Sequence, residues 1–258
     1  MALAFDHLVY FTDKALNNHI DSLKKQGIHA VRGGSHKDWG TYNTLSYFGL
    51  TYVEFLAVEK EEIARKATQN PLIGQLMQSF PEKQGPGQFA IRTDRIDHLK
   101  ILLEQKGLET RLFPGRRKRE DGSTLNWKLL FITSNDKGNK LSPPFFIDWL
   151  EPDMERDTDL REKGFIGKHP AGDLRMDHLK IIVEDAEKTS LTWQGWLGLS
   201  KGRSYIDNGL QAECTVLELD GCRLHFCSPL GEGPAQDLLR ERGERPYELV
   251  LSNGLKLK

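Results

Sequence analysis

Apolar and polar positions alternate with a period of two over residues 5–12 (FDHLVYFT), a pattern typical of a strand with one buried face. Between residues 13 and 25 the period lengthens, so that Ile20 and Leu23 fall on one face of a helix. Gly27 predicts the end of that helix, because glycine is favoured immediately after a last helical turn. The chain therefore begins with a strand followed by a helix.

Three more strands are predicted in the next thirty residues. The first covers residues 29–32 and ends in a turn at Gly33 and Gly34. The other two are the β-rich runs 41–48 (TYNTLSYF) and 50–58 (LTYVEFLAV), separated by Gly49. The order of elements in this first module is β-α-β-β-β.

The same order of elements recurs twice. The second module contains the strand GQFAIRT, a helix over 94–106, a strand near 109–113, and the strands WKLLFIT and FFIDWL. The third module contains the strand LRMDHLKIIV, a helix over 185–197, and the strands AECTVLEL and CRLHFCSP. A helix over 71–80 precedes the second module, and a helix over 234–242 leads into a last strand over 247–252. The chain thus contains three modules and the first strand of a fourth.

Individual residues repeat along with the period. Asp6-His7-Leu8 reappears as Asp177-His178-Leu179, and the position of Glu54 in the first module is taken by His225 in the third. The separation is 47 positions in both cases. Residues 152–172 show the least periodicity, so we predict a domain over 1–152, a linker over 153–173, and the third module with the C-terminal helix and strand over 174–258.

The first 150 residues resemble the glyoxalase-like branch of the vicinal oxygen chelate superfamily. The segments that carry the resemblance are DHLVYF, GGSHKDWGTYN, TYVEFLAV, GQFAIRTD, residues 121–127 and PPFFIDWLEP. The resemblance implies an α+β fold in which paired βαβββ modules form cupped mixed sheets. It also implies a divalent metal ion (Zn, Mn, Fe, Co or Ni), held by residues from the first and last strands of two modules.

Carried over by position, the implied metal ligands are His7, Glu54, Gln88 and Asp148. Gln88 follows from aligning GQFAIRT with DHLVYFT, and Asp148 from aligning FIDW with YVEF. His7 and Glu54 match the pattern well, whereas Asp148 is shorter than the usual Glu and Gln88 is neutral. The alternatives are that His7 and Glu54 hydrogen-bond each other across the sheet and that Gln88 binds substrate. His178 and His225 are interpreted as structural histidines, because their partner module is truncated.

The resemblance predicts proton removal next to a carbonyl or enediolate oxygen, with Glu54 or His36 as the general base. The glycine-rich loop around His36 also offers Thr41 and Asn43 as substrate-binding residues, although both could instead bond their own turn. Trp127 could form a wall of the cup. Arg92 could bind an anionic group, although a single Arg is often merely solvated.

The composition excludes several classes of function. With 36 basic and 37 acidic residues, the chain has no net field that would attract nucleic acid. No apolar run approaches the roughly 20 residues that cross a bilayer, and the N-terminus lacks the pattern of a signal peptide. Three cysteines in one stretch do not indicate a disulfide framework, so a reducing, cytoplasmic location is expected.

Two functions follow as hypotheses. The first is a metal-dependent lyase, isomerase or dioxygenase of the glyoxalase-like group that acts on a small oxygenated substrate. The alternative is a metal-free protein that binds or sequesters a small molecule, favoured by the Trp and Phe content of the expected cup. An unpaired third module could also pair with a second copy of the chain and form a homodimer.

Overall fold

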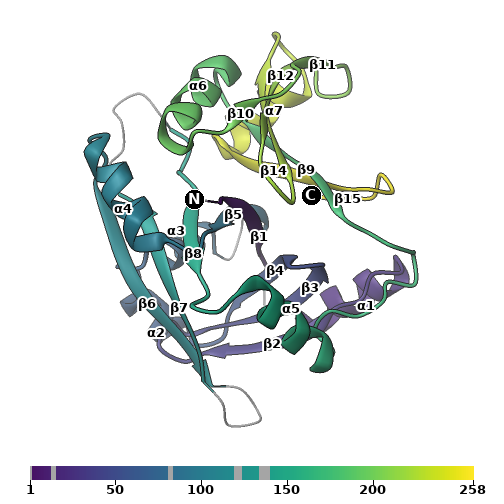
Figure 1. Ribbon diagram of the computed structural model, residues 1–258. Helices are drawn as coiled ribbons and strands as arrows, with labels where there is room; N and C mark the ends of the chain where they lie inside the picture. The colour runs from purple at the N-terminus through teal and green to yellow at the C-terminus, as the bar shows by residue number, and fades with distance from the viewer. Residues whose placement is uncertain (1, 13–15, 81–83, 119–123, 134–139) are drawn as a thin grey trace.

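The computed structural model describes residues 2–12, 16–80, 84–118, 124–133 and 140–258, which form two curled mixed sheets with helices around them (Figure 1). The first sheet contains β1 (Ala4–Phe11), β2 (Val31–His36), β3 (Thr41–Phe48), β4 (Thr51–Val58), β5 (Gly85–Arg92), β6 (Thr110–Lys118), β7 (Thr124–Ile132) and β8 (Phe145–Asp148). The second contains β9 (Met176–Ile182), β10 (Ser200–Lys201), β11 (Tyr205–Asp207), β12 (Ala212–Glu218), β13 (Arg223–Pro229), β14 (Arg245–Leu251) and β15 (Lys256–Leu257). The helices are α1 (Leu16–Lys25), α2 (Glu61–Lys66), α3 (Pro71–Ser79), α4 (Ile96–Gln105), α5 (Asp153–Glu162), α6 (Ala186–Leu197) and α7 (Pro234–Arg242).

The first sheet joins two βαβββ modules through their first strands. Its strand order is β2-β3-β4-β1-β5-β8-β7-β6, with β1 antiparallel to β5. Within each module the first and last strands are parallel, β1 with β4 and β5 with β8. Leu8 lies opposite Phe89 at the centre of the β1–β5 pair, as the alignment of GQFAIRT with DHLVYFT requires. The predicted α+β fold of paired, cupped βαβββ modules is confirmed.

The two faces of this sheet have separate cores because successive residues of a strand point to opposite sides. Val9, Ala90 and Ile147 belong to a cluster on the concave side, whereas Leu8 and Phe89 belong to a larger cluster on the other side. The concave cluster is bordered by α2 and α3, which contribute Ala64 and Ile73 among other residues. Helix α2 was not predicted, since it is only six residues long.

The second sheet repeats the same arrangement. Its main path is β10-β12-β13-β9-β14-β15, with β9 parallel to β13 and antiparallel to β14. Leu179 lies opposite Leu249 just as Leu8 lies opposite Phe89. The third module and the single strand of a fourth were therefore correctly predicted from the repeat, and the structure adds the short strands β10, β11 and β15.

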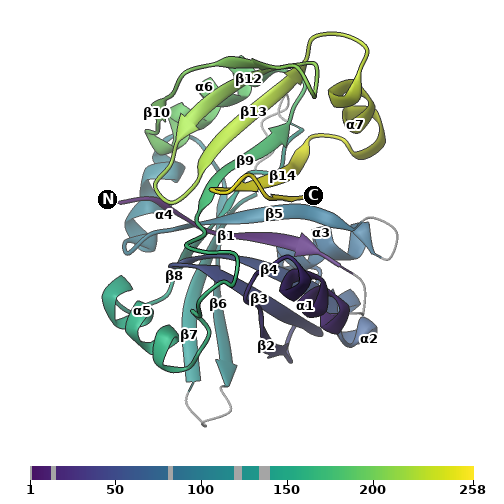
Figure 2. The same cartoon turned by 90° about the vertical axis from the view of Figure 1, so that its right-hand side faces the viewer.

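The two sheets pack against each other through a shared core. The larger cluster includes Phe89 from β5, Trp193 from α6 and Phe226 from β13, and the rings of Phe89 and Trp193 lie 5.8 Å apart. Strand β14 also contacts β5, and the two strands run beside one another in Figure 2. The residues buried between the two sheets therefore belong to the hydrophobic core of both sheets.

Residues 153–173, predicted as a linker, contain helix α5 and pack on the first sheet. Leu160 and Ile166 form a buried cluster with Leu45, Tyr47 and Tyr52. The helix is charged on almost every side, which is why its sequence suggested a connecting segment. Only Arg156 and Leu160, four positions apart and therefore on one face, are buried within it.

The structure corrects the expectation for the cysteines. Cys214 and Cys227 are direct neighbours on β12 and β13 and are joined by a disulfide, while Cys222 is free and buried. Adjacent strands bring these two cysteines together although they are 13 positions apart, a proximity that spacing alone does not reveal. Among the described residues, no helix is long and apolar enough to cross a membrane.

Candidate functional site

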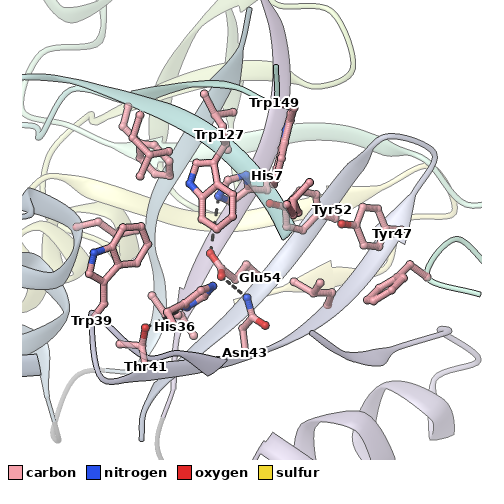
Figure 3. Close-up of a pocket in the computed structure, with 18 of the residues that line it drawn as sticks. His7, His36, Trp39, Thr41, Asn43, Tyr47, Tyr52, Glu54, Trp127 and Trp149 are labelled. Atoms are coloured by element: carbon pink, nitrogen blue, oxygen red, sulfur yellow. Dashed lines mark hydrogen bonds and ion pairs between the residues drawn. The ribbon is translucent and has the colours of Figure 1, made fainter. Parts of the chain in front are cut away.

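A cavity opens on the concave face of the first sheet, and most of the side chains that line it are shown in Figure 3. It has a polar floor and largely aromatic or aliphatic walls. Its lining residues are His7, His36, Trp39, Thr41, Asn43, Leu45, Tyr47, Tyr52, Glu54, Leu56, Leu72, Ile73, Leu125, Trp127, Leu129, Phe145, Ile147, Trp149, Glu151, Arg156, Leu160 and Phe165. A mostly apolar pocket with a few convergent polar groups is the usual form of a small-molecule site.

His7 and Glu54 face each other at the floor of the cavity (Figure 3). Nε2 of His7 lies 3.7 Å from Oε2 of Glu54, which is too far for a hydrogen bond. The other oxygen of Glu54 accepts a short hydrogen bond from Nδ2 of Asn43. Both His7 and Glu54 are buried. Because Nε2 of His7 and Oε2 of Glu54 lie this close, one polar group of a ligand in the cavity can contact both side chains.

Asp6 orients the ring of His7 from behind. Its Oδ1 lies 2.7 Å from Nδ1 of His7, so Nδ1 bears a proton and donates it. In the neutral imidazole, Nε2 is then an acceptor directed toward Glu54 and the cavity. This arrangement of a carboxylate behind a histidine fixes both the tautomer and the orientation of the ring.

Asp6 is itself at the centre of a buried network. Its Oδ2 accepts hydrogen bonds from Nη1 of Arg92 at 3.2 Å and from Nε1 of Trp149 at 3.0 Å, and it lies 3.7 Å from Nη1 of Arg156. Burial alone would raise the pKa of Asp6, but Arg156, the hydrogen bond to His7 and Arg92 together hold it well below its usual range. Asp6 is therefore ionised whenever the protein is folded near neutral pH.

A bulge in β1 explains how adjacent residues can serve one site. Phe5 and His7 pair with the consecutive residues Ile91 and Ala90 of β5, so Asp6 is an extra residue with no partner on that strand. A bulge redirects side chains that would otherwise alternate across the sheet. Asp177 is the extra residue of the same kind between Met176 and His178 in the second sheet. The repeated Asp-His-Leu sequence therefore coincides with a β-bulge that occurs in both sheets.

Aromatic rings form most of the walls. His7 stacks on Tyr52 with ring centroids 4.5 Å apart and meets the edge of Phe145 at 5.4 Å. Trp127 of β7 packs between Trp39 and Trp149, at 6.3 and 5.7 Å. Burial raises the pKa of Tyr52 well above its ordinary value, so its hydroxyl stays protonated. The walls favour a ligand with a flat or apolar body.

Two glycines permit this packing. A Cβ at Gly115 would lie 2.1 Å from Nε1 of Trp127, its direct neighbour across β6 and β7. A Cβ at Gly33 would lie 2.0 Å from Oδ1 of Asn43 on the adjacent strand. At both positions a larger residue would displace a side chain that lines the cavity.

The structure brings together six of the predicted site residues: His7, His36, Thr41, Asn43, Glu54 and Trp127. His36 and Thr41 are linked at the rim, with Nδ1 of His36 lying 3.1 Å from Oγ1 of Thr41. Asn43 contacts the catalytic candidate Glu54 rather than bonding its own turn. The structure does not bring Gln88, Asp148 or Arg92 into the cavity.

The strand register explains the position of Asp148. Val9 pairs with Glu54, and its counterpart Ala90 pairs with Phe145, so the position equivalent to Glu54 in the second module is Phe145. Asp148 lies three residues further along β8, on the opposite face, and its Oδ1 accepts the backbone N–H of Leu150. The alignment of FIDW with YVEF was therefore displaced by three positions.

Gln88 and Arg92 are occupied elsewhere. Nε2 of Gln88 donates to the carbonyl of Pro143, while its Oε1 accepts the backbone N–H of Phe89. Gln88 lines a separate surface hollow, not the cavity with His7. Arg92 bridges Asp6 and Asp153, with Nε 2.9 Å from Oδ1 of Asp153, and so lies behind the site.

A large part of the chain matches a known protein family. The family model for the glyoxalase-like domain matches residues 5–197. The chain belongs to the glyoxalase-like domain family. This confirms the glyoxalase-like resemblance that the sequence indicated.

Solved structures agree on the fold of this glyoxalase-like protein. A hypothetical protein from Staphylococcus aureus is 22% identical with a TM-score of 0.75, the match covering 96% of this chain and 90% of the other. A mutant of 4-hydroxymandelate synthase from Streptomyces coelicolor is 12% identical with a TM-score of 0.62, covering 97% and 71%. A search of curated proteins gave no significant match.

The residues present do not fit the four-ligand metal set that the family resemblance implied. Only His7 and Glu54 of that set face the cavity, and Phe145 stands where the second module would supply a carboxylate. Throughout the described ranges, no three His, Cys, Asp or Glu side chains are grouped closely enough to hold a metal ion. Catalytic zinc sites use three protein ligands. Of the implied ligand set, the described residues of this cavity supply two, His7 and Glu54.

The second sheet has a different set of residues at the equivalent positions. The rings of His178 and His225 stack with their centroids 4.1 Å apart. In the strand register, Glu248 is paired with Lys180, and these two positions correspond to Gln88 and Val9 in the first sheet. The ammonium of Lys180 lies 3.2 Å from Glu248 and 2.6 Å from Asp207. A lysine cation therefore neutralises the carboxylates. Burial, together with His178 and Arg223, lowers the pKa of His225 to about 3, in keeping with a structural role for this histidine.

The sequence did not single out Asp6, Tyr52 or Arg156. The recurrence of Asp before His in two modules was the available signal for Asp6, but its burial depends on the bulge. Tyr52 lies two positions before Glu54 and so on the same face of its strand, but aromatic residues are common in strands and this one gave no functional signal. Arg156 lies in the segment predicted as a linker, where a charged residue is ordinarily exposed.

Proposed function

We propose that this glyoxalase-like protein is a lyase or isomerase that moves a proton on a small oxygenated substrate, with Glu54 as the general base. The observation that supports it is the buried pair of His7 and Glu54, whose facing atoms lie 3.7 Å apart without a hydrogen bond between them. A general base must be able to reach the proton that it removes. The unbonded faces of both side chains point into the cavity.

The roles of the two residues differ. Oε2 of Glu54 accepts a proton from a carbon next to a carbonyl or hydroxyl group, while Asn43 keeps the carboxylate in place through Oε1. His7, with its Nδ1 held by Asp6, accepts the hydroxyl proton of the substrate at Nε2 and returns it to the neighbouring carbonyl oxygen. Glu54 then gives its proton to the adjacent carbon, so both side chains end in their starting protonation states. The aromatic walls exclude water, which strengthens these polar contacts.

Residues at the rim complete the proposed site. Thr41 and His36 are joined to each other and offer a hydroxyl and a ring nitrogen to the substrate. Trp127 holds the body of the substrate against the opposite wall. His36 is the second candidate for the base, since it also lines the cavity.

A divalent ion such as Zn, Mn, Fe, Co or Ni was the cofactor expected from the family. Bound at this floor, it would act as a Lewis acid on the substrate oxygen. Its protein ligands would be Nε2 of His7 and the carboxylate of Glu54 alone. Because that set falls short of three protein ligands, the proposed proton transfer is assigned to the side chains themselves, and a dioxygenase activity is less favoured.

The test is hydrogen–deuterium exchange followed by proton NMR. A panel of small 2-oxo and 2-hydroxy compounds is incubated in D₂O with the wild-type protein, Glu54→Gln, His36→Gln and Glu59→Gln. Glu59 is exposed and accepts a hydrogen bond from Ser35 outside the cavity, so it serves as the matched control. We expect exchange in the wild type, Glu59→Gln and His36→Gln, and at least about a hundredfold loss in Glu54→Gln.

Two outcomes would overturn this assignment. Exchange that is undiminished in Glu54→Gln but lost in His36→Gln would make His36 the base. An absence of exchange with every compound would count against proton transfer altogether.

The aromatic lining specifically favours a second candidate function, a binding or sequestering protein. Trp39, Trp127 and Trp149 all line the cavity, so a ligand that enters should quench tryptophan emission. Under this alternative, quenching persists in excess chelator, and no bound compound is altered after prolonged incubation. Turnover of any quenching ligand would contradict it.

A further inference from the structure

Arg156 is a cation buried in the wall of the cavity. It belongs to helix α5 and is 3% exposed. It lines the cavity together with Tyr47, Tyr52 and Trp149. Its guanidinium lies over the ring of Trp149, 4.2 Å from the centroid. Arginine is almost never this deeply buried without a partner for its charge.

The end groups of this guanidinium have no hydrogen-bond acceptor among the residues that the structure describes. Both Nη1 and Nη2 are buried, and neither donates a hydrogen bond. Its ion-pair partner Asp6 lies 3.7 Å from Nη1, and the oxygens of Asp6 already accept hydrogen bonds from His7, Arg92 and Trp149. Leaving buried donors unpaired is unfavourable, and a carboxylate satisfies two parallel N–H groups at once.

The charge of Arg156 is maintained by its surroundings. Burial alone would lower its pKa, but the Asp6 carboxylate raises the pKa above the ordinary value. Asp6 also serves Arg92, so one buried carboxylate is shared by two arginines. The wall of the cavity thus carries a guanidinium cation at Arg156, whereas Glu54 supplies a carboxylate at the floor.

We propose that Arg156 binds the carboxylate of the ligand, and that the cavity therefore takes small organic acids whose oxygenated carbon lies against Glu54 and His7. Asp6 contacts both His7 and Arg156, so only a few bonds separate the acid group from the reacting carbon. The carboxylate of Glu54 repels the acid group of a ligand from the floor of the cavity, which favours the orientation with that group at Arg156. This inference rests on the proposed function, because it concerns the same cavity.

The experiment compares matched acid and amide probes by tryptophan fluorescence. The pairs are phenylacetate with phenylacetamide and 2-oxobutyrate with 2-oxobutyramide, titrated into the wild type and variants. Charge-assisted bonds to a buried guanidinium predict that the acid binds at least about tenfold more tightly than the amide. In Arg156→Met this preference should fall below about threefold.

Two further variants keep the test interpretable. Arg156→Lys preserves the charge but loses the planar fork, so it should fold even where Arg156→Met does not, and should show an intermediate preference. Arg161→Met lies on the same helix, where Arg161 pairs with Asp157 at the surface, and should match the wild type. Circular dichroism verifies the fold of each variant.

The outcomes separate this inference from the proposed function. Equal affinity for acid and amide in the wild type, binding of neither acid, or an unchanged preference in both Arg156 variants would overturn the inference. Glu54→Gln should abolish exchange while keeping the acid preference. Acid binding that depends on Arg156 without any exchange would leave the inference standing and refute the proposed reaction.

Discussion

Asp6 illustrates how one residue can hold a site together. Its carboxylate is fully buried and interacts with His7, Arg92, Trp149 and Arg156. A buried carboxylate is tolerated only when it is paired and hydrogen-bonded. Asp6 therefore contributes both to stability and to the orientation of His7.

We expect Asp6→Asn to lower the free energy of unfolding by about 3–5 kcal/mol, because the buried Arg156 and the partly buried Arg92 lose their shared counter-charge. Urea denaturation at neutral pH measures the change. Asp153→Asn is the control, since Asp153 also pairs with Arg92 but is half exposed; it should cost about 1 kcal/mol or less. Similar effects of the two substitutions would contradict the network.

The difference in stability between the wild type and Asp6→Asn should depend on pH in a defined direction. Because the native pKa of Asp6 lies below the value of about 3.8 for an ordinary Asp, its stabilisation is complete above that pH. The stabilisation is lost as the pH falls through the native pKa. The gap between wild type and Asp6→Asn should therefore be constant above about pH 5 and shrink below pH 4.

Some of these residues could be predicted from the sequence and others could not. His7 and Glu54 were carried over by position from the family resemblance, and the same two positions recur at identical spacing in the third module. Phe145, and not Asp148, takes the second-module position, because strand register depends on hydrogen-bond pairing that a similar tetrapeptide does not define. Arg156 could not be predicted as buried, since its environment comes from residues far away in the chain.

At the scale of elements, the shape of the cavity depends on the approach of β6 to β7. Gly115 of β6 is opposite Trp127, and only the absence of a side chain lets the indole lie against that strand. The periodic strands and helices were predicted well because each buries one face. Helix α5 was missed because its buried face consists of only two residues.

Gly115→Ala should displace Trp127, weaken ligand binding and destabilise the fold by about 1–3 kcal/mol, as expected for overpacking. Thermal denaturation and tryptophan emission measure both effects. Gly195→Ala is the control within α6, where a Cβ meets nothing within 4 Å; it should be neutral or stabilise by up to about 1 kcal/mol. Unchanged stability and emission in Gly115→Ala would show that β6 can adjust.

For the molecule as a whole, the two sheets share one core. Phe89 of the first sheet packs on Trp193 of the second, and β14 lies against β5. The predicted boundaries at 152 and 174 separate sequence modules, and whether each half folds alone stays a prediction. The shared core favours a single cooperative unit.

We therefore expect one transition in calorimetry, with equal calorimetric and van't Hoff enthalpies. Trp193→Ala, at the centre of the shared core, should lower the temperature of that single transition and cost about 3–5 kcal/mol. Two separate transitions, only one of them shifted by the substitution, would show that the halves unfold independently.

We propose that His7 and Glu54 transfer a proton without a resident metal ion. The most direct test is elemental mass spectrometry of untagged wild-type protein beside Glu54→Gln, combined with the exchange assay after treatment with chelator. We expect well under one divalent ion per chain, the same in both proteins, and exchange that survives chelation. About one ion per chain, lost in Glu54→Gln together with chelator-sensitive exchange, would contradict it and establish a metal-dependent site.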